Sequence, residues 1–197
     1  MSEEDFYRLA GEDSDWEYID GRIVMHSPAS DRHEDLFCFL LTLFRYYLGR
    51  RQAGVVRGSR FPMRLDEKWS PEPDLLVVRE EHRGLIARQR LEGPADLVVE
   101  IVSEADPHLI YREKLPRYRD AGIPEIWIVD PLRRLVIADR AAGPGREQSA
   151  RKSGRLASAV LPGFWIDVGW LWHEGQEGEA ELPPPHTCLE EILGSQG

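Results

Sequence analysis

The chain has 197 residues, of which 42% are hydrophobic and six are tryptophans, so it is long enough to bury a core and too apolar for a disordered chain. Its 25 Lys and Arg residues against 35 Asp and Glu residues give a formal net charge of −10, which excludes a global basic field that would attract nucleic acid. A local basic groove can still exist on an acidic protein, and the two cysteines exclude a disulfide framework and a cysteine metal cluster.

The N-terminal segment is acidic and lacks the charged-then-apolar pattern of a signal peptide. No apolar run approaches the roughly 18–20 residues of a membrane span. We therefore expect a cytoplasmic protein that does not bind a membrane. We expect one folded domain over residues 1–172, and then an acidic, proline-containing tail over residues 173–197 with little part in the core.

The first β-strands predicted along the chain form a hairpin over residues 16–27. Asp20-Gly21 supplies the positive φ angles of a tight turn. By the period of two, Glu17 and Ile19 share one strand face and Tyr18 lies on the other. A charged residue on a small hairpin is usually solvated, so this pattern alone makes Glu17 a weak site candidate.

A long helix is predicted next, over residues 33–49, with Ser30-Asp31 before it as N-cap and Gly49 ending it in the C′ role. Its apolar residues lie almost all round the helix, so we expect a sheet on one side and a partner element or a second subunit on the other. We interpret this surface as the interface of a homodimer. His33 and Glu34 occupy the first turn, where capping and solvation are their ordinary roles.

Three strands are predicted at residues 54–65, 75–78 and 96–102, and the last two are short apolar runs typical of buried strands. Asp74 opens the first of these two runs, and Glu100 lies near the end of the other. A buried carboxylate is costly unless it is paired, hydrogen-bonded or bound to a cation. Taken singly, Asp74 could cap a strand and Glu100 could pair with a basic residue. The two together favour a site for Mg²⁺, which prefers oxygen ligands.

The rest of the chain is predicted to form a helix over residues 107–121, strands at 125–130 and 133–139, an exposed loop over 141–155, and an apolar segment over 157–172 that covers one end of the sheet. Pro116 lies inside the helix and removes a hydrogen bond, so we expect a kink or a later start there.

A Mg²⁺ ion held by two carboxylates often completes its coordination with water and phosphate. A lysine two positions after Glu100, on the same strand face, could bind such a phosphate, but the residue there is Val102. The nearest lysine is Lys114 on the returning helix, with Tyr111 and Tyr118 on its face. A helix lysine is usually solvated; only its place in the order of elements makes Lys114 a candidate.

The ordered segments WEYIDGRIV, SPASDRH, PEPDLLVV, GPADLVVEIVS, EKLPRY, AGIPEIWIVDP and LPGFWIDV cover residues 16 to about 168. In this set the sequence resembles the PD-(D/E)XK nuclease superfamily, and more closely a widespread, mostly uncharacterised bacterial family assigned as endonucleases. The resemblance implies a restriction-endonuclease-like αβββαβ core: a mixed central sheet flanked by helices, with an N-terminal hairpin. It also implies a Mg²⁺- or Mn²⁺-dependent phosphodiesterase that acts on DNA. Asp74 and Glu100 match the metal ligands, with the carbonyl of Ile101 as a third.

Three further residues match site positions of the family. Lys114 matches the lysine that has moved from strand to helix, His33 a histidine at the start of the first long helix, and Glu17 an acidic residue of the hairpin. Two positions depart from the family pattern. Ile110 stands where the family often has an acidic residue one turn before the lysine, and Glu104 replaces a common proline.

Two functions from different classes follow. In one, the protein is a metal-dependent endonuclease, as the carboxylate pair and Lys114 favour. In the other, the fold is kept but the site is inactive, and the protein is a binding module or dimeric scaffold; the acidic charge and Ile110 favour this function.

Overall fold

A six-stranded mixed sheet forms the centre of the computed structural model. The structure describes residues 1–10, 14, 16–25, 27–58, 60–104, 107–142, 144–172 and 182–194. The strands, in spatial order, are β10 (Gly145–Arg151), β9 (Leu135–Ala142), β8 (Glu125–Asp130), β7 (Leu97–Ile101), β5 (Leu75–Arg79) and β3 (Gly54–Gly58). Only β7 and β8 run parallel; the other neighbours are antiparallel.

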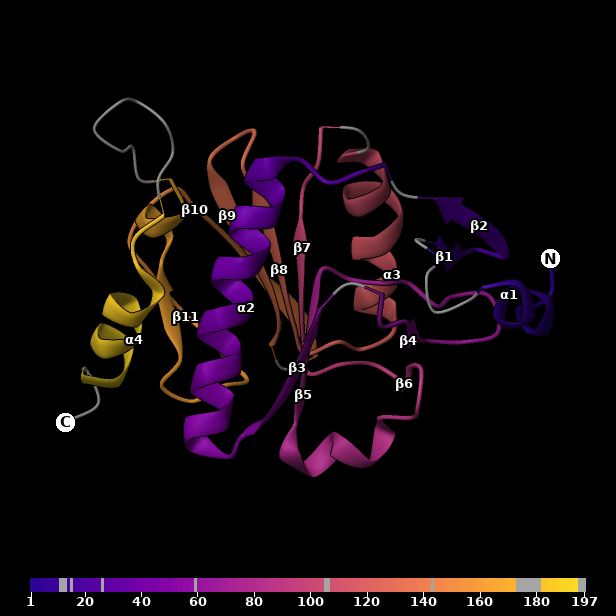
Figure 1. Cartoon of the computed structure of the whole chain (residues 1–197), viewed down its shortest axis with the longest axis horizontal. Coiled ribbons are helices and arrows are strands. Elements are labelled where there is room, and N and C mark those ends of the chain that lie inside the picture. Colours follow the sequence, from indigo (N-terminus) through magenta and orange to yellow (C-terminus); the bar gives the residue numbers. More distant parts are fainter. Residues whose placement is uncertain are drawn as a thin grey trace.

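Helices cover both faces of this sheet (Figure 1). On one face lie α2 (Asp31–Arg51) and α4 (Pro185–Gly194), and on the other lies α3 (Leu115–Asp120). The N-terminal helix α1 (Glu3–Leu9) and the hairpin of β1 (Trp16–Ile19) and β2 (Arg22–Met25) sit on the α3 side. This arrangement confirms the predicted fold class, N-terminal hairpin included. None of the described helices is long and apolar enough to cross a membrane.

Short elements complete the fold. They are two 3₁₀ segments (Glu80–Leu85 and Val168–Trp172), the parallel pair β4 (Met63–Arg64) and β6 (Leu91–Glu92), and the antiparallel pair β11 (Arg155–Ala157) and β12 (Trp165–Asp167).

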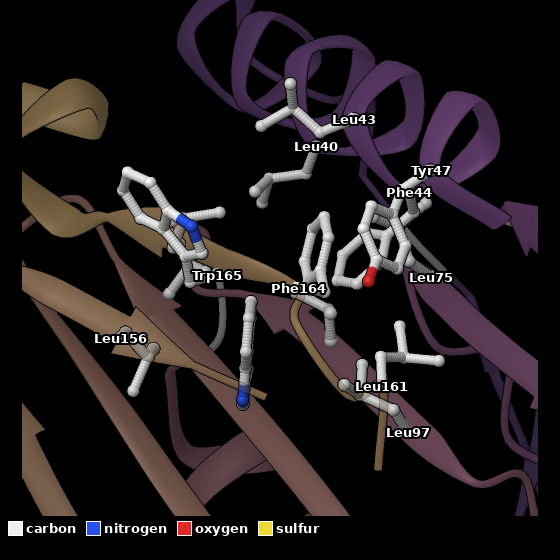
Figure 2. Close-up of a cluster of buried hydrophobic side chains, with 14 of the residues drawn as sticks. Leu40, Leu43, Phe44, Tyr47, Leu75, Leu97, Leu156, Leu161, Phe164 and Trp165 are labelled. Atoms are coloured by element: carbon white, nitrogen blue, oxygen red, sulfur yellow. The ribbon is translucent and has the colours of Figure 1, made fainter. Parts of the chain in front are cut away.

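The larger core lies between the sheet and α2 (Figure 2). The buried residues of α2 recur every three or four positions: Leu36, Phe39, Leu40, Leu43, Phe44, Tyr47 and Leu48. Phe164 stacks on Phe44 with ring centroids 4.6 Å apart, so the segment before β12 fills the space under the helix. The α3 face has its own cluster around Tyr118.

The hairpin turn agrees with the sequence pattern, since Asp20 and Gly21 both have positive φ angles, of 51° and 74°. The irregularity expected near Pro116 is also present. Residues Leu109–Lys114 form a π-helical segment, and Pro116 occupies the first turn of α3, where its missing N–H is tolerated. The sequence also predicts Asp106 as the N-cap of this helix, with Pro107 as its first residue, but position 106 lies outside the described residues.

Three predicted boundaries were wrong. The long helix does not end at Gly49; it continues to Arg51, and Gln52 takes the left-handed conformation with φ 51°. The strand predicted over residues 54–65 is two strands in different sheets, β3 and β4, because the chain turns between them at Arg60 (φ 69°). Within the loop predicted over residues 141–155, residues 145–151 are a strand.

This strand, β10, forms an edge of the sheet and pairs antiparallel with β9, of which only the last two residues fall in the predicted loop. Most of β10 is exposed, so its residues carry no apolar alternation by which a strand would be recognised. The Arg146 guanidinium pairs with the buried Asp139 carboxylate and donates a hydrogen bond to the carbonyl of Ile123 (2.9 Å), which ties the edge to the core.

The expectation that the chain after residue 172 takes little part in the core was wrong for α4. Cys188, Leu189 and Ile192 of α4 are buried in the core cluster that also contains α2. Much of the apolar surface of α2 that the sequence suggested for a second subunit is therefore covered by the chain itself.

Candidate active site

The register of β5 and β7 brings Asp74 and Glu100 together. The antiparallel pairing joins Leu75 to Val99 and Leu76 to Val98, so the next position outward sets Asp74 opposite Glu100. Because Leu76 and Val98 face the α3 side of the sheet, the period of two puts both acidic residues on that same face. The backbone N–H of Ile101 donates a 2.6 Å hydrogen bond to Asp74 Oδ2, which fixes that carboxylate.

Lys114 reaches this face from the π-helical segment and is almost completely buried, at 2% exposure. Its Nζ lies 2.8 Å from Glu17 Oε1 and donates to both oxygens of Glu100, at 3.0 and 3.2 Å. The ordinary role of a helix lysine, a solvated surface charge, is therefore wrong for this residue. Ile110 does not leave Lys114 without an orienting carboxylate, because two other elements supply one each.

Glu17 is fully buried, so the solvated role expected for a hairpin carboxylate is also wrong. Its Oε2 accepts a 3.0 Å hydrogen bond from the backbone N–H of Glu72. Tyr18 exchanges backbone hydrogen bonds with Ser70, and Arg22 of β2 pairs with Glu113. These contacts fix the hairpin both to the segment that leads into β5 and to the residue before Lys114.

Tyr118 belongs to the same cluster, although the sequence only placed it on the face of Lys114 and gave it no role. Its hydroxyl donates a 2.6 Å hydrogen bond to Glu100 Oε1, and the residue is fully buried. The signal available in the sequence was the spacing of four residues from Lys114. Tyr111, the other tyrosine of that face, instead donates to Asp130 (2.6 Å).

His33 joins the site from the start of α2. Its backbone N–H donates to Ser30 Oγ (3.2 Å), the capping contact expected there, while its ring Nε2 lies 3.3 Å from Asp74 Oδ1. Its side chain is 15% exposed, whereas the neighbouring Glu34 is exposed, as its ordinary role predicts.

The electrostatics of the cluster follow from burial and from three carboxylates sharing one lysine. Burial raises the pKa of Glu100 to about 7; the Lys114 charge opposes this, and Asp74 and Glu17 add to it. Burial acts to lower the pKa of Lys114, but the charges of Glu100 and Glu17 outweigh it and raise that pKa above its usual value. Lys114 is therefore charged at neutral pH.

Two neighbouring groups are shifted as well. Burial raises the pKa of Tyr118 well above its ordinary value, so the hydroxyl is a neutral donor to Glu100. Burial would lower the pKa of His33, but the hydrogen bond to Asp74 and its charge raise it.

The cluster opens onto a cleft of about 540 Å³. Five of the six candidate site residues line it: His33, Asp74, Glu100, Ile101 and Lys114. Glu17 does not line it and joins the cluster through its contact with Lys114. The described residues hold no cluster of three His, Cys, Asp or Glu ligands, which a closed metal site would require. Two carboxylates and a backbone carbonyl fit a hard cation that keeps water ligands, and the surplus of negative charge favours one.

The fold is a mixed α/β sheet with Glu100 and Lys114 buried beside the partly exposed Asp74 at an open cleft. It resembles the crystal structure of a putative nuclease belonging to DUF820 from Anabaena variabilis ATCC 29413, with a TM-score of 0.74 and 15% identity. The match covers 87% of this chain and 97% of that chain.

Residues 3–169 match the model of the Uma2 family, described as "Putative restriction endonuclease". The chain therefore belongs to the Uma2 family. A search of curated proteins found no match. The resemblance to the nuclease superfamily is thus confirmed at the level of family and fold.

Proposed function

We propose that this protein is a Mg²⁺- or Mn²⁺-dependent endonuclease that hydrolyses phosphodiester bonds in DNA. The observation that carries the proposal is the buried Lys114 charge, held between Glu17 and Glu100 beside Asp74 at the base of an open cleft. A lysine as buried as Lys114 must be paired with carboxylates. Packing of the core alone requires neither the lysine nor its carboxylate partners. Clusters of this kind are typical of functional sites.

Asp74, Glu100 and the carbonyl of Ile101 would hold the metal ion, which when bound makes water more acidic and offsets the charge on the phosphate. The Asp74 carboxylate is already oriented for this role by the N–H of Ile101. Tyr118 keeps Glu100 in place through its neutral hydroxyl.

Lys114 would meet a phosphate oxygen in the cleft and stabilise the negative charge that develops in the transition state. Glu17 is a positioning residue in this proposal: it does not line the cleft, and its Oε1 holds the ammonium group at 2.8 Å. His33 stands at the rim, next to Asp74, where its ring assists the approach of the phosphate.

A second candidate function is an inactive nuclease-fold binding module or dimeric scaffold. One observation favours it: both oxygens of Glu100 are already engaged, by Lys114 and Tyr118, so a metal ion must compete with the lysine. The net charge of −10 also opposes the approach of DNA.

The test is a single-turnover cleavage assay with Mg²⁺ and Mn²⁺ on single- and double-stranded DNA, with calorimetry of metal binding alongside. We expect Asp74→Asn to lose both cleavage and metal binding. Lys114→Met keeps the side-chain length and should slow cleavage about 10²- to 10³-fold while metal still binds. Lys152→Met, at an exposed lysine far along the chain, is the matched control.

Full activity of Lys114→Met would remove the lysine from the mechanism. Metal binding by the wild-type protein without cleavage of either form of DNA would favour the inactive module. If the wild type neither binds metal nor cleaves, the metal-dependent endonuclease is excluded.

A further inference from the structure

A second, smaller cavity of about 230 Å³ lies beside the cleft. Arg60 and Glu72 line both spaces, so the two lie side by side. The walls of the smaller cavity come from α1, the start of β1 and the turn before β4. Its aromatic residues are Phe6, Tyr7, Trp16 and Phe61.

Three of these rings border the open space, and one of them, Phe61, also packs against the core cluster on the α3 face. Phe6 is 1% exposed and stacks on Tyr18 with ring centroids 5.0 Å apart, so it closes the floor. Tyr7, Trp16 and Phe61 are only partly buried around the open space. Their partly exposed faces are therefore available to a planar ligand.

The Tyr7 ring is held in place before any ligand arrives. Its hydroxyl donates a 2.7 Å hydrogen bond to Ser70 Oγ, and the Arg90 guanidinium lies 4.4 Å from its centroid. Arg88 is exposed at the edge of the same cavity and adds a positive charge there. Rigid aromatic faces next to an arginine suit a planar ring attached to a phosphate.

We propose that this cavity binds one unpaired nucleobase of the strand whose phosphate lies in the cleft. Aromatic side chains stack on any base, and an arginine beside them follows the phosphate backbone. The volume is below the ~300–1,000 Å³ typical of drug-sized ligands, so it suits a single base and excludes a base pair in a duplex.

This inference rests on the proposed nuclease function and narrows its substrate. The preferred nucleic acid has an unpaired nucleotide close to the phosphate that is cut, either in a single strand or at a frayed or distorted duplex position. Intact duplex would leave the aromatic cavity empty.

The test is equilibrium binding, measured by fluorescence anisotropy in Ca²⁺ and in EDTA, so that cleavage is not needed. The probes are a labelled single strand of about 12 nucleotides, its duplex, and a series with one abasic site moved along the strand. We expect the single strand to bind more tightly than the duplex, and one abasic position to weaken binding about tenfold.

Trp16→Leu should weaken binding of the intact strand by a similar factor and should abolish the effect of the abasic site, because both changes remove the same contact. Phe61→Leu is the second variant, in case the first unfolds in a melting experiment. Tyr46→Leu, at an exposed ring on α2, is the aromatic control and should change nothing.

A flat abasic series, equal binding of duplex and single strand, or unchanged binding in both wall variants would overturn the base site. If the wild type still cleaves DNA in any of these cases, the endonuclease stands and only the base site falls. If it neither binds nor cleaves, both fall.

Discussion

Lys114 and Glu100 are two charges that the fold has taken out of water together. Removing one partner of such a pair leaves the other buried and uncompensated, which is strongly destabilising. The cluster is also unbalanced, because Glu17, Glu100 and Asp74 face one lysine. This excess of carboxylates helps to raise the pKa of Glu100, and the raised pKa has a measurable effect on stability.

We predict that Glu100 makes the metal-free protein less stable as the pH rises from about 4.5 to about 7. Its pKa is raised to about 7 in the folded protein from 4.5 in the unfolded chain, so between these values the folded protein binds the extra proton. The free energy of unfolding therefore falls with pH across this window and is level above it. The total change is roughly 1–3 kcal/mol.

The measurement is urea unfolding in EDTA at pH 5, 6, 7 and 8 for the wild type and Glu100→Gln. The stability of the wild type relative to the variant should decrease up to about pH 7 and then stay constant. Glu190→Gln, at an exposed glutamate of α4, is the control. A wild-type advantage that grows with pH would show the opposite sign and refute the prediction.

At the scale of the element, the packing of α4 on the core is the feature that the sequence analysis did not predict. This helix is short and separated from the rest by an acidic stretch, and only Cys188, Leu189 and Ile192 of it are buried. Three inward residues give too little periodicity for a helix to be assigned to a core.

We predict that Ile192→Ala lowers the free energy of unfolding by about 2–4 kcal/mol, because the side chain is fully buried in the core next to α2. Urea unfolding measures the loss, and Glu190→Ala on the exposed side of the same helix is the matched control. A cost of less than about 0.5 kcal/mol would show that α4 is not docked in solution.

What could be predicted from the sequence was local or periodic. The apolar runs of β5, β7 and β8 predicted these strands, and an acidic residue in each of the first two predicted a shared site. The register that sets Asp74 opposite Glu100 on one face comes from the pairing of β5 with β7, which the sequence does not specify. What failed depended on distant partners. Glu17 is buried because Lys114, far along the chain, pairs with it, and β10 is a strand because β9 supplies its hydrogen bonds.

At the scale of the whole molecule, the net charge of −10 and the open edge of the sheet decide what can approach. An acidic surface slows the encounter with nucleic acid, so the cleft depends on local cations and on a bound metal ion. The strand β3 ends the six-stranded sheet, and an edge strand presents unpaired backbone groups.

The apolar flank of α2 lies beside that edge. Phe37 and Leu41 remain half-buried, and the Phe37 ring is close to Gly58 of β3, where an added Cβ would meet it at 2.7 Å. With α4 covering another part of the helix, this flank is the surface left for the homodimer that we propose.

We predict that the protein sediments as a dimer at micromolar concentration, and that Leu41→Lys converts it to a monomer. The lysine places a charge on the flank where a second copy would bury Leu41, while its long stem can still cover the edge of the core. Sedimentation velocity measures the state of both proteins, and thermal melting checks that the variant stays folded. Lys152→Glu, at an exposed site, should leave the dimer intact. A wild-type monomer would mean that the sheet and α4 alone account for the apolar surface of α2, and that each chain carries a complete and independent cleft.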